Sequence, residues 1–326
     1  MATRRYLIRV LISVFLVTAV LLGTDLRALG RLLVSIDYRY VLCIVAISLV
    51  DRVLMAYKWR LLLEAAGVGL SLWFSVKAYL IAGLLGAVLP TSVGGDIFRA
   101  YYSARVVGQA DKVIASIAIE RAVGVVASAA FALFGLMALA ASDFSSLPSA
   151  RLLGIAAVAL ALSAIALRIS LDRRVLAFVE RRLDRFQHRL LGKLLQSHRA
   201  YVDYNERSGV LPAFFLLSLF EQSLFSFMNY YAARALHLDV SLIYFIGIIP
   251  LCHIIMRLPI SINAIGVHEG LYVFFFSQLG LSVTEAFSIA LVIRIVWLWV
   301  HLASAAIYLT DGAGRAVRMR VAEKCL

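Results

Sequence analysis

The sequence has 326 residues, of which 63% are hydrophobic and 16% are charged, and its mean hydropathy is +0.91. Soluble proteins are about half apolar and a quarter charged, so this composition excludes an ordinary soluble domain and predicts an integral membrane protein. The net charge of +13 raises the question of nucleic-acid binding. However, the basic residues cluster between and beyond the apolar segments, as in cytoplasmic loops beside anionic lipid, and no basic-aromatic module is visible. We therefore expect no nucleic-acid partner.

Six apolar segments are long enough to cross a bilayer, which takes about 20 residues. They lie at residues 6–24, 40–62, 113–141, 150–168, 210–235 and 285–310. Arg4 and Arg5 place the start of the first segment in the cytoplasm, and a basic tail over 311–326 places the other end there too. The sequence therefore predicts an all-α polytopic membrane protein with both termini inside.

Two further apolar segments, 72–105 and 240–282, are interrupted by proline and glycine. In each, an apolar run ends at a Leu-Pro pair, and serine and glycine follow before a second short helix begins. If both termini and the basic middle of the chain are cytoplasmic, each broken segment must leave and return on one face. Each is also followed by a long span with a buried arginine, Arg121 or Arg294. The sequence thus predicts two re-entrant helical hairpins in an inverted repeat, the first entering from the cytoplasm and the second from the opposite face.

The middle of the chain, residues 169–208, is a basic connector. Apolar residues recur there at three- and four-residue spacing from Leu176 to Leu194, which predicts an amphipathic helix on the cytoplasmic membrane surface. The alternative is a plain connector whose charges are solvated. We expect a single transmembrane domain over 1–326, made of a first half (1–168), this connector, a second half (209–310) and the basic tail.

The two broken segments also indicate where a ligand binds. Non-helical backbone inside a membrane is tolerated only beside protein or a wet cavity, and such breaks in both halves of a transporter mark its binding site. Glycines let backbone amides approach a ligand, and the start of a helix attracts anions such as phosphate. The predicted binding residues for a lipid headgroup are Pro90, Ser92, Gly94, Gly95, Asp96, Arg99, Glu120, Arg121, Pro259, Ser261, Asn263, Gly266, His268, Glu269 and Arg294.

The charged members of this set have different predicted roles. Arg121 and Arg294 are the predicted phosphate clamps, because a guanidinium is a planar fork of donors that stays charged when buried. Asp96 would repel a phosphate, so we expect it to cap its helix and neutralise the arginine three residues further on. Glu120 and Glu269 either orient the clamping arginines, bind a headgroup amine or carry a coupling proton. A purely structural ion pair is the alternative for each glutamate.

No signature of catalysis or of a cofactor accompanies these residues. His268 is next to Glu269, but no second histidine or cysteine has the spacing of a metal ligand. The three cysteines, Cys43, Cys252 and Cys325, are odd in number and widely separated, so they indicate neither disulfides nor a metal site. A nucleophile elbow, a P-loop and a dinucleotide fingerprint are all missing from the sequence. We expect no catalytic residue, no metal and no cofactor.

These motifs resemble those of a known family, the membrane region of lysylphosphatidylglycerol synthase/flippase proteins. The resemblance covers the chain from Lys58 to Tyr308. It is carried by Leu89-Pro90 through Gly94-Gly95-Asp96, Arg99, Glu120-Arg121, Pro259 through Gly266, Glu269-Gly270 and Arg294. The sequence departs from the family at Ala264, where glycine is common, and at His268, where arginine is common. The second departure exchanges a permanent cation for one that titrates.

The resemblance implies a lipid flippase or transporter in a bacterial inner membrane. Its substrate would be a phospholipid, an aminoacyl-phospholipid, a polyprenyl lipid or a hopanoid, with an anionic or phosphate-bearing headgroup. The chain ends without a soluble acyltransferase-like domain, which argues against tRNA-dependent lysine transfer, and a hopanoid-associated subgroup is similar in size. Two alternatives stay open. One is a membrane transferase with Asp96, Glu120 or Glu269 as general base, and the other is a non-catalytic partner of a lipid-synthesis enzyme. A homodimer is a further option.

Overall fold

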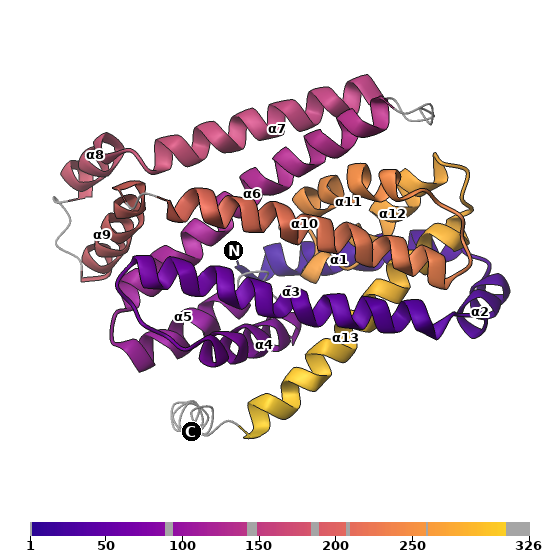
Figure 1. The fold of residues 1–326 in the computed structure, drawn as a ribbon, viewed down its shortest axis with the longest axis horizontal. Coiled ribbons are helices and arrows are strands. Elements are labelled where there is room, and N and C mark those ends of the chain that lie inside the picture. The colour runs from indigo at the N-terminus through magenta and orange to yellow at the C-terminus, as the bar shows by residue number, and fades with distance from the viewer. Residues whose placement is uncertain are drawn as a thin grey trace.

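The computed structural model describes residues 2–88, 94–141, 149–183, 189–206, 209–258 and 260–310, which form thirteen α-helices, two short 3₁₀ helices and no strand (Figure 1). The helices are α1 (Ala2–Leu22), α2 (Leu26–Val34), α3 (Tyr38–Ala65), α4 (Leu72–Val88), α5 (Gly94–Val107), α6 (Ala110–Ala140), α7 (Ser149–Ser170), α8 (Arg173–Leu183), α9 (Arg189–Val202), η1 (Asp203–Glu206), α10 (Val210–Ala235), α11 (Leu242–Met256), η2 (Ile262–Ala264), α12 (Val267–Ser277) and α13 (Val283–Thr310). The predicted all-α fold is confirmed.

Within the described ranges, five helices are long and apolar enough to cross a membrane: α3, α6, α7, α10 and α13. The sixth predicted span, 6–24, corresponds to α1, which bends by 85° into the short helix α2. Asp25 lies at the bend and accepts hydrogen bonds from the backbone N–H groups of Arg27 and Ala28, which caps the new helix. The count of about six spans is therefore confirmed, and the end of the first one is sharply bent.

Two four-helix units, α3–α6 and α10–α13, have the same order of helix lengths. Each runs long, short, short, long, with 28, 17, 14 and 31 residues in the first unit and 26, 15, 11 and 28 in the second. Both first helices also end in the same left-handed turn. Gly67 (φ +73°) donates its N–H to the carbonyl of Glu64, and His237 (φ +59°) donates its N–H to the carbonyl of Arg234. These likenesses support the predicted repeat. That the hairpins are re-entrant in a membrane stays a prediction, as do the domain bounds.

The two units pack reciprocally. Helix α3 lies along α10, while α4 packs on α13 of the other unit and α11 packs on α6. The first short helix of each unit therefore rests against the last long helix of the other unit, α4 on α13 and α11 on α6 (Figure 1). The hairpin between α4 and α5 is tight, because a Cβ at Gly95 would collide with the carbonyl oxygen of Ala82. Glycine is needed there for close approach of the two backbones.

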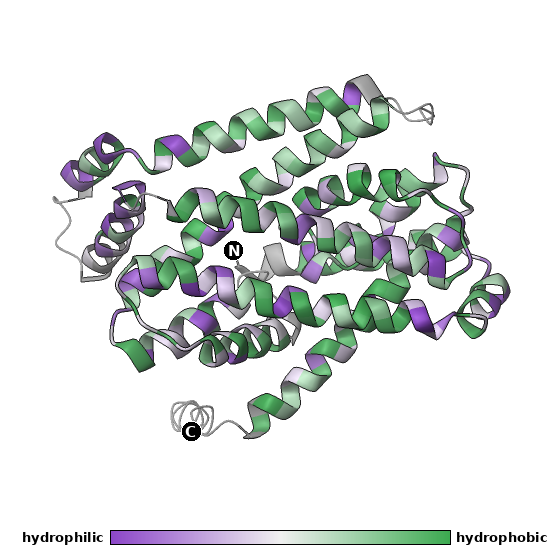
Figure 2. Cartoon of the chain, in the orientation of Figure 1, coloured by the Kyte–Doolittle hydropathy of each residue, from purple (hydrophilic) through white to green (hydrophobic). Residues whose placement is uncertain are grey.

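The connector forms α8 and α9 at one end of the bundle, so the single amphipathic helix predicted over this region was wrong. Figure 2 shows hydrophilic residues gathered on α8 and α9, whereas α7 is mainly hydrophobic. Helix α9 packs on α6, and the hydroxyl of the buried Tyr204 donates to the carbonyl of Leu62 at 2.8 Å. Across the connector, Arg199 pairs with Glu180 at 2.6 Å. This region is therefore anchored to the bundle and is more than a solvated linker.

Candidate functional site

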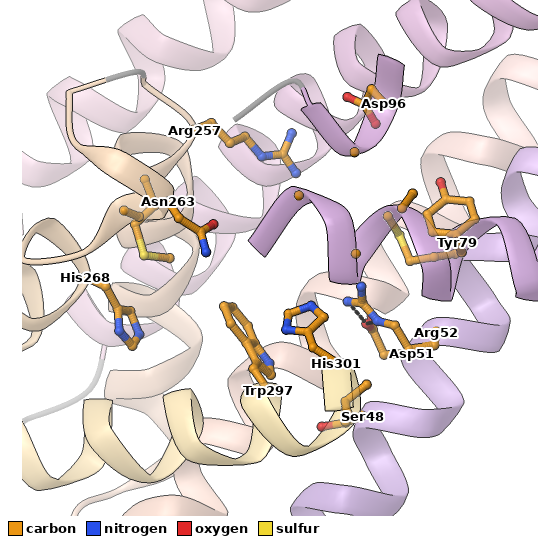
Figure 3. A pocket seen from close by; sticks show the side chains of 18 of the residues that line it. Ser48, Asp51, Arg52, Tyr79, Asp96, Arg257, Asn263, His268, Trp297 and His301 are labelled. Carbon is orange, nitrogen blue, oxygen red and sulfur yellow. Dashed lines mark hydrogen bonds and ion pairs between the residues drawn. The ribbon is translucent and has the colours of Figure 1, made fainter. Parts of the chain in front are cut away.

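A cavity of about 640 Å³ lies between the two four-helix units (Figure 3). Helices from both units contribute to its wall, as does the segment between α11 and α12. Nine of the predicted site residues line it: Gly95, Asp96, Arg99, Glu120, Arg121, Ser261, Asn263, His268 and Arg294. The fold thus brings residues from both broken segments and from both following spans to one polar chamber.

Of the other six predicted residues, Gly94, Gly266 and Glu269 are described by the structure and do not line the cavity. Pro90, Ser92 and Pro259 lie outside the described residues, and Gly94 is buried in the first turn of α5. Gly266 faces α1, because a Cβ on it would lie 2.7 Å from Cβ of Leu16. Its N–H donates to the Glu269 carboxylate at 2.8 Å, so this amide already has a partner. The glycine at this position is required by the positive φ of +82° and by the close contact with α1.

The charged residues that line the cavity in the first unit form ion pairs with one another. Arg99 is only 1% exposed, and its Nη2 lies 2.9 Å from Oε2 of Glu120 and 3.4 Å from Oδ1 of Asp96. Its guanidinium is held between two aromatic rings, 4.7 Å from that of Trp59 and 4.3 Å from that of Tyr79. Arg121 binds Asp96 through Nη2 at 2.6 Å and through Nε at 2.8 Å. Glu120 therefore holds Arg99, and the carboxylate that orients Arg121 is Asp96.

The second unit contains a matching ion pair. Arg294 donates through Nε to Oε1 of Glu269 at 2.5 Å, as predicted for an orienting glutamate. In both units the carboxylate precedes the arginine by 25 residues, Asp96 before Arg121 and Glu269 before Arg294. The two predicted clamps are thus equivalent in the repeat, and each is already paired.

Several wall residues were not predicted from the sequence. Asp51 and Arg52 pair at 2.5 Å within α3 and line the cavity. Trp297 and His301 add an aromatic wall from α13, and Figure 3 shows both rings turned into the chamber. Arg257, the last residue before the second Leu-Pro pair, also points inward. The only sequence signal for it was its position at the end of an apolar run.

Charge balance in the cavity wall singles out Arg257. The wall contains five arginines, and four carboxylates bind them: Arg52 with Asp51, Arg99 with Glu120, Arg121 with Asp96, and Arg294 with Glu269. The nearby Glu221 is bonded to Lys58. Within the described part of the chain, Arg257 alone among these five arginines has no carboxylate or hydrogen-bond partner. Among the residues that the structure describes, no three His, Cys, Asp or Glu side chains are arranged to hold a metal ion.

The family model described as "Lysylphosphatidylglycerol synthase TM region" matches residues 6–305, which include the first four-helix unit, the second unit as far as residue 305 and every described residue of the cavity wall. The comparison with curated proteins and the comparison with solved structures found no match. Because the family model covers nearly the whole chain, this multi-pass membrane protein belongs to the family defined by the lysylphosphatidylglycerol synthase TM region.

Proposed function

We propose that this protein moves an amphiphilic lipid between the two leaflets of a bacterial cytoplasmic membrane. The headgroup would pass through the cavity between the units while the acyl or polyprenyl tails stay in the bilayer. The observation that carries the proposal is the charged wall of this cavity, placed inside a bundle of apolar spans. An ionisable residue in a membrane helix costs about 2.5–3.5 kcal/mol on insertion scales, so its presence marks a polar path.

The size and position of the cavity support a headgroup as the ligand. Its volume of about 640 Å³ lies within the range of small-molecule sites, which runs from about 300 to 1,000 Å³. The wall combines paired charges with the side chains of Met55, Met228 and Met256, which adapt to ligands of varied shape. Such a mixture suits a polar headgroup that must enter and leave without being held too tightly.

The reciprocal packing suggests how the path opens to each side in turn. Substrate sites in transporters with repeats lie between the repeats, and rocking of one repeat against the other exposes the site alternately. Here the pairs Asp96–Arg121 and Glu269–Arg294 occupy equivalent positions in the two units. We propose that each pair closes its own side of the cavity. Cytoplasmic placement of both termini, and a second copy or a lipid-synthesis enzyme as partner, stay predictions.

Translocation of a fluorescent phospholipid in proteoliposomes tests this proposal. Labelled lipid in the inner leaflet is protected from dithionite until it crosses the bilayer. We expect the wild-type protein to accelerate the loss of this protection. Val125→Trp should abolish the effect, because Val125 lines the cavity. Val158→Trp is the matched control, since Val158 is 57% exposed on α7 and faces away from the bundle core. Wild-type rates no faster than empty vesicles across several lipid classes would refute the proposal.

The transferase alternative makes a different prediction for the same preparation. Purified protein incubated with a lipid carrier and a labelled headgroup donor should then release a new labelled lipid, and Glu120→Gln should stop its formation. Under our proposal no product forms, and the lipid that crosses the bilayer keeps its original mass in mass spectrometry.

A further inference from the structure

We infer that the anionic group of the headgroup binds on the second-unit wall of the cavity, to Arg257 together with Ser261, Asn263 and His268. This inference rests on the proposed function and changes which arginine is expected to contact the headgroup. The two arginines that the sequence favours, Arg121 and Arg294, then act as paired structural or gating groups and leave the first contact with the anion to Arg257.

Arg257 carries the unpaired charge among the described arginines of the wall. It follows the last turn of α11, and in Figure 3 its guanidinium points into the space beside the α4–α5 hairpin. No ion pair or hydrogen bond joins its side chain to another described residue, although four carboxylates are bonded to the other wall arginines. An anion that approaches Arg257 forms a charge-assisted contact without first breaking a protein ion pair.

Binding at Arg121 or Arg294 would be more costly. Each is held by a carboxylate at 2.6 Å or 2.5 Å, so a phosphate would have to displace that carboxylate. The displaced Asp96 or Glu269 would then lie beside the phosphate, and like charges at short range repel. Arg99 is further disfavoured, because it is enclosed by Trp59 and Tyr79.

Two buried polar residues on the same wall as Arg257 also have atoms without hydrogen-bond partners. Ser261 is 7% exposed and His268 is 2% exposed, and neither Oγ of Ser261 nor Nε2 of His268 has a hydrogen-bond partner in the described part of the protein. Nδ1 of His268 lies 3.5 Å from Oε1 of Glu269 but has no hydrogen-bond partner among the described residues either. Buried polar atoms normally have partners. Unpartnered atoms of Tyr79, Arg99 and Glu120 also line the first-unit wall, whereas those of Ser261 and His268 lie on the wall of Arg257, where they can meet a ligand with acceptor oxygens.

The segment between α11 and α12 completes this wall. Asn263 (φ +48°) and Ala264 (φ +55°) both adopt left-handed backbone conformations, which are unfavourable for residues with a Cβ. This conformation places the Asn263 side chain in the cavity between Arg257 and His268, as Figure 3 shows. Such backbone strain is often found at ligand sites. Arg257, Ser261, Asn263 and His268 all line this cavity, and each carries a group that can donate a hydrogen bond.

Helix α6 provides the room that Arg257 occupies. A Cβ on Gly124 would lie 3.2 Å from Nη1 of Arg257, so alanine at this position would push the guanidinium by a few tenths of an ångström. A Cβ on Gly154 of α7, by contrast, would meet no neighbouring atom within 4 Å. Both substitutions replace a helical glycine with alanine, but only Gly124→Ala changes the contact with Arg257.

Native mass spectrometry with dioleoyl phosphatidylglycerol tests the assignment, with dioleoylglycerol as the ligand that lacks phosphate. We expect the wild-type protein to prefer the phospholipid and Arg257→Gln to weaken its binding about tenfold or more, the usual effect of losing a charged hydrogen bond. Gly124→Ala should weaken it less, and Gly154→Ala should not. Arg60→Gln, which removes an exposed arginine paired with Glu64 outside the cavity, is the arginine control.

The outcomes separate this inference from the proposed function. If the wild-type protein shows no preference for the phospholipid, the headgroup function itself fails. If it shows one and Arg257→Gln binds equally well, the assignment to Arg257 is overturned while the function stands. Competition by inorganic phosphate would show that the phosphate group alone is recognised, whereas no competition would show that the lipid tails are required. If Arg257→Gln does not fold, the two alanine variants test the assignment instead. Weaker phospholipid binding by Gly124→Ala than by Gly154→Ala would support it, and equal binding would overturn it.

Discussion

Replacing Glu120 with glutamine is expected to destabilise the folded protein by about 3 kcal/mol, because it removes one partner of a buried ion pair. Arg99 would lose its nearest carboxylate at 2.9 Å while staying enclosed between two aromatic rings. The remaining contact, Asp96 at 3.4 Å, is already shared with Arg121. Equilibrium unfolding of the purified protein in detergent and denaturant measures the change.

Glu64→Gln is the matched control for this substitution. Glu64 pairs with Arg60 at 2.6 Å, but both side chains are about a third or more exposed, so the expected loss is about 0–1 kcal/mol. Arg257→Gln should also leave stability nearly unchanged, since no carboxylate depends on that arginine. A Glu120→Gln variant with wild-type stability and lost lipid binding would move Glu120 from the structural set to the ligand contacts.

Gly135→Ala is expected to cost about 3 kcal/mol, at the upper end of the usual range for overpacking. Its new Cβ would collide with the carbonyl oxygen of Ile246 and would lie 2.8 Å from Cα of Gly247, so the contact is with backbone. Backbone cannot rotate away as a side chain can, and therefore α6 and α11 would have to move apart. The same unfolding measurement and a translocation assay would report the effect on stability and on the cavity.

In the same unfolding assay, Gly154→Ala is expected to stabilise the protein, whereas Gly135→Ala destabilises it. With no neighbour within 4 Å, Gly154→Ala should stabilise α7 by about 0.5–1 kcal/mol, the difference in helix propensity between alanine and glycine. Equal effects of the two substitutions would contradict the close approach of α6 and α11. That approach matters for function because α6 carries Glu120 and Arg121, and α11 leads to Arg257.

Much of the fold followed from the sequence because hydropathy and proline act locally. A run of about 20 apolar residues must satisfy its backbone polar groups internally in lipid, and a helix is the simple way to do so. The long helices therefore agree with the predicted spans. The broken segments were predicted for the same reason, since proline and paired glycines interrupt the pattern within a few residues. The bend after α1 and the division of the connector into α8 and α9 were missed.

The candidate site, like the fold, could be predicted only in part from the sequence. Composition and motif indicated which charged residues matter, including Asp96, Arg121, Glu269 and Arg294, since charges inside apolar runs are costly and few. Which charge meets which partner was decided by packing. Asp96 reaches Arg121 because α5 lies against α6, and Glu120 is left for Arg99 by the same contact.

Only the tertiary structure could single out Arg257. In the sequence it is one arginine among many at the end of an apolar run, and nothing nearby tells whether a carboxylate will reach it. The packing of α11 on α6 places it against Gly124, while the carboxylates around the cavity are bonded to other basic residues. Sequence determined that this protein is a bundle of membrane helices with two breaks, because those properties are set by neighbouring residues. Charge pairing among the described residues, and the unpaired state of Arg257 among them, depend on contacts between distant helices, and these exist only once the two units pack together.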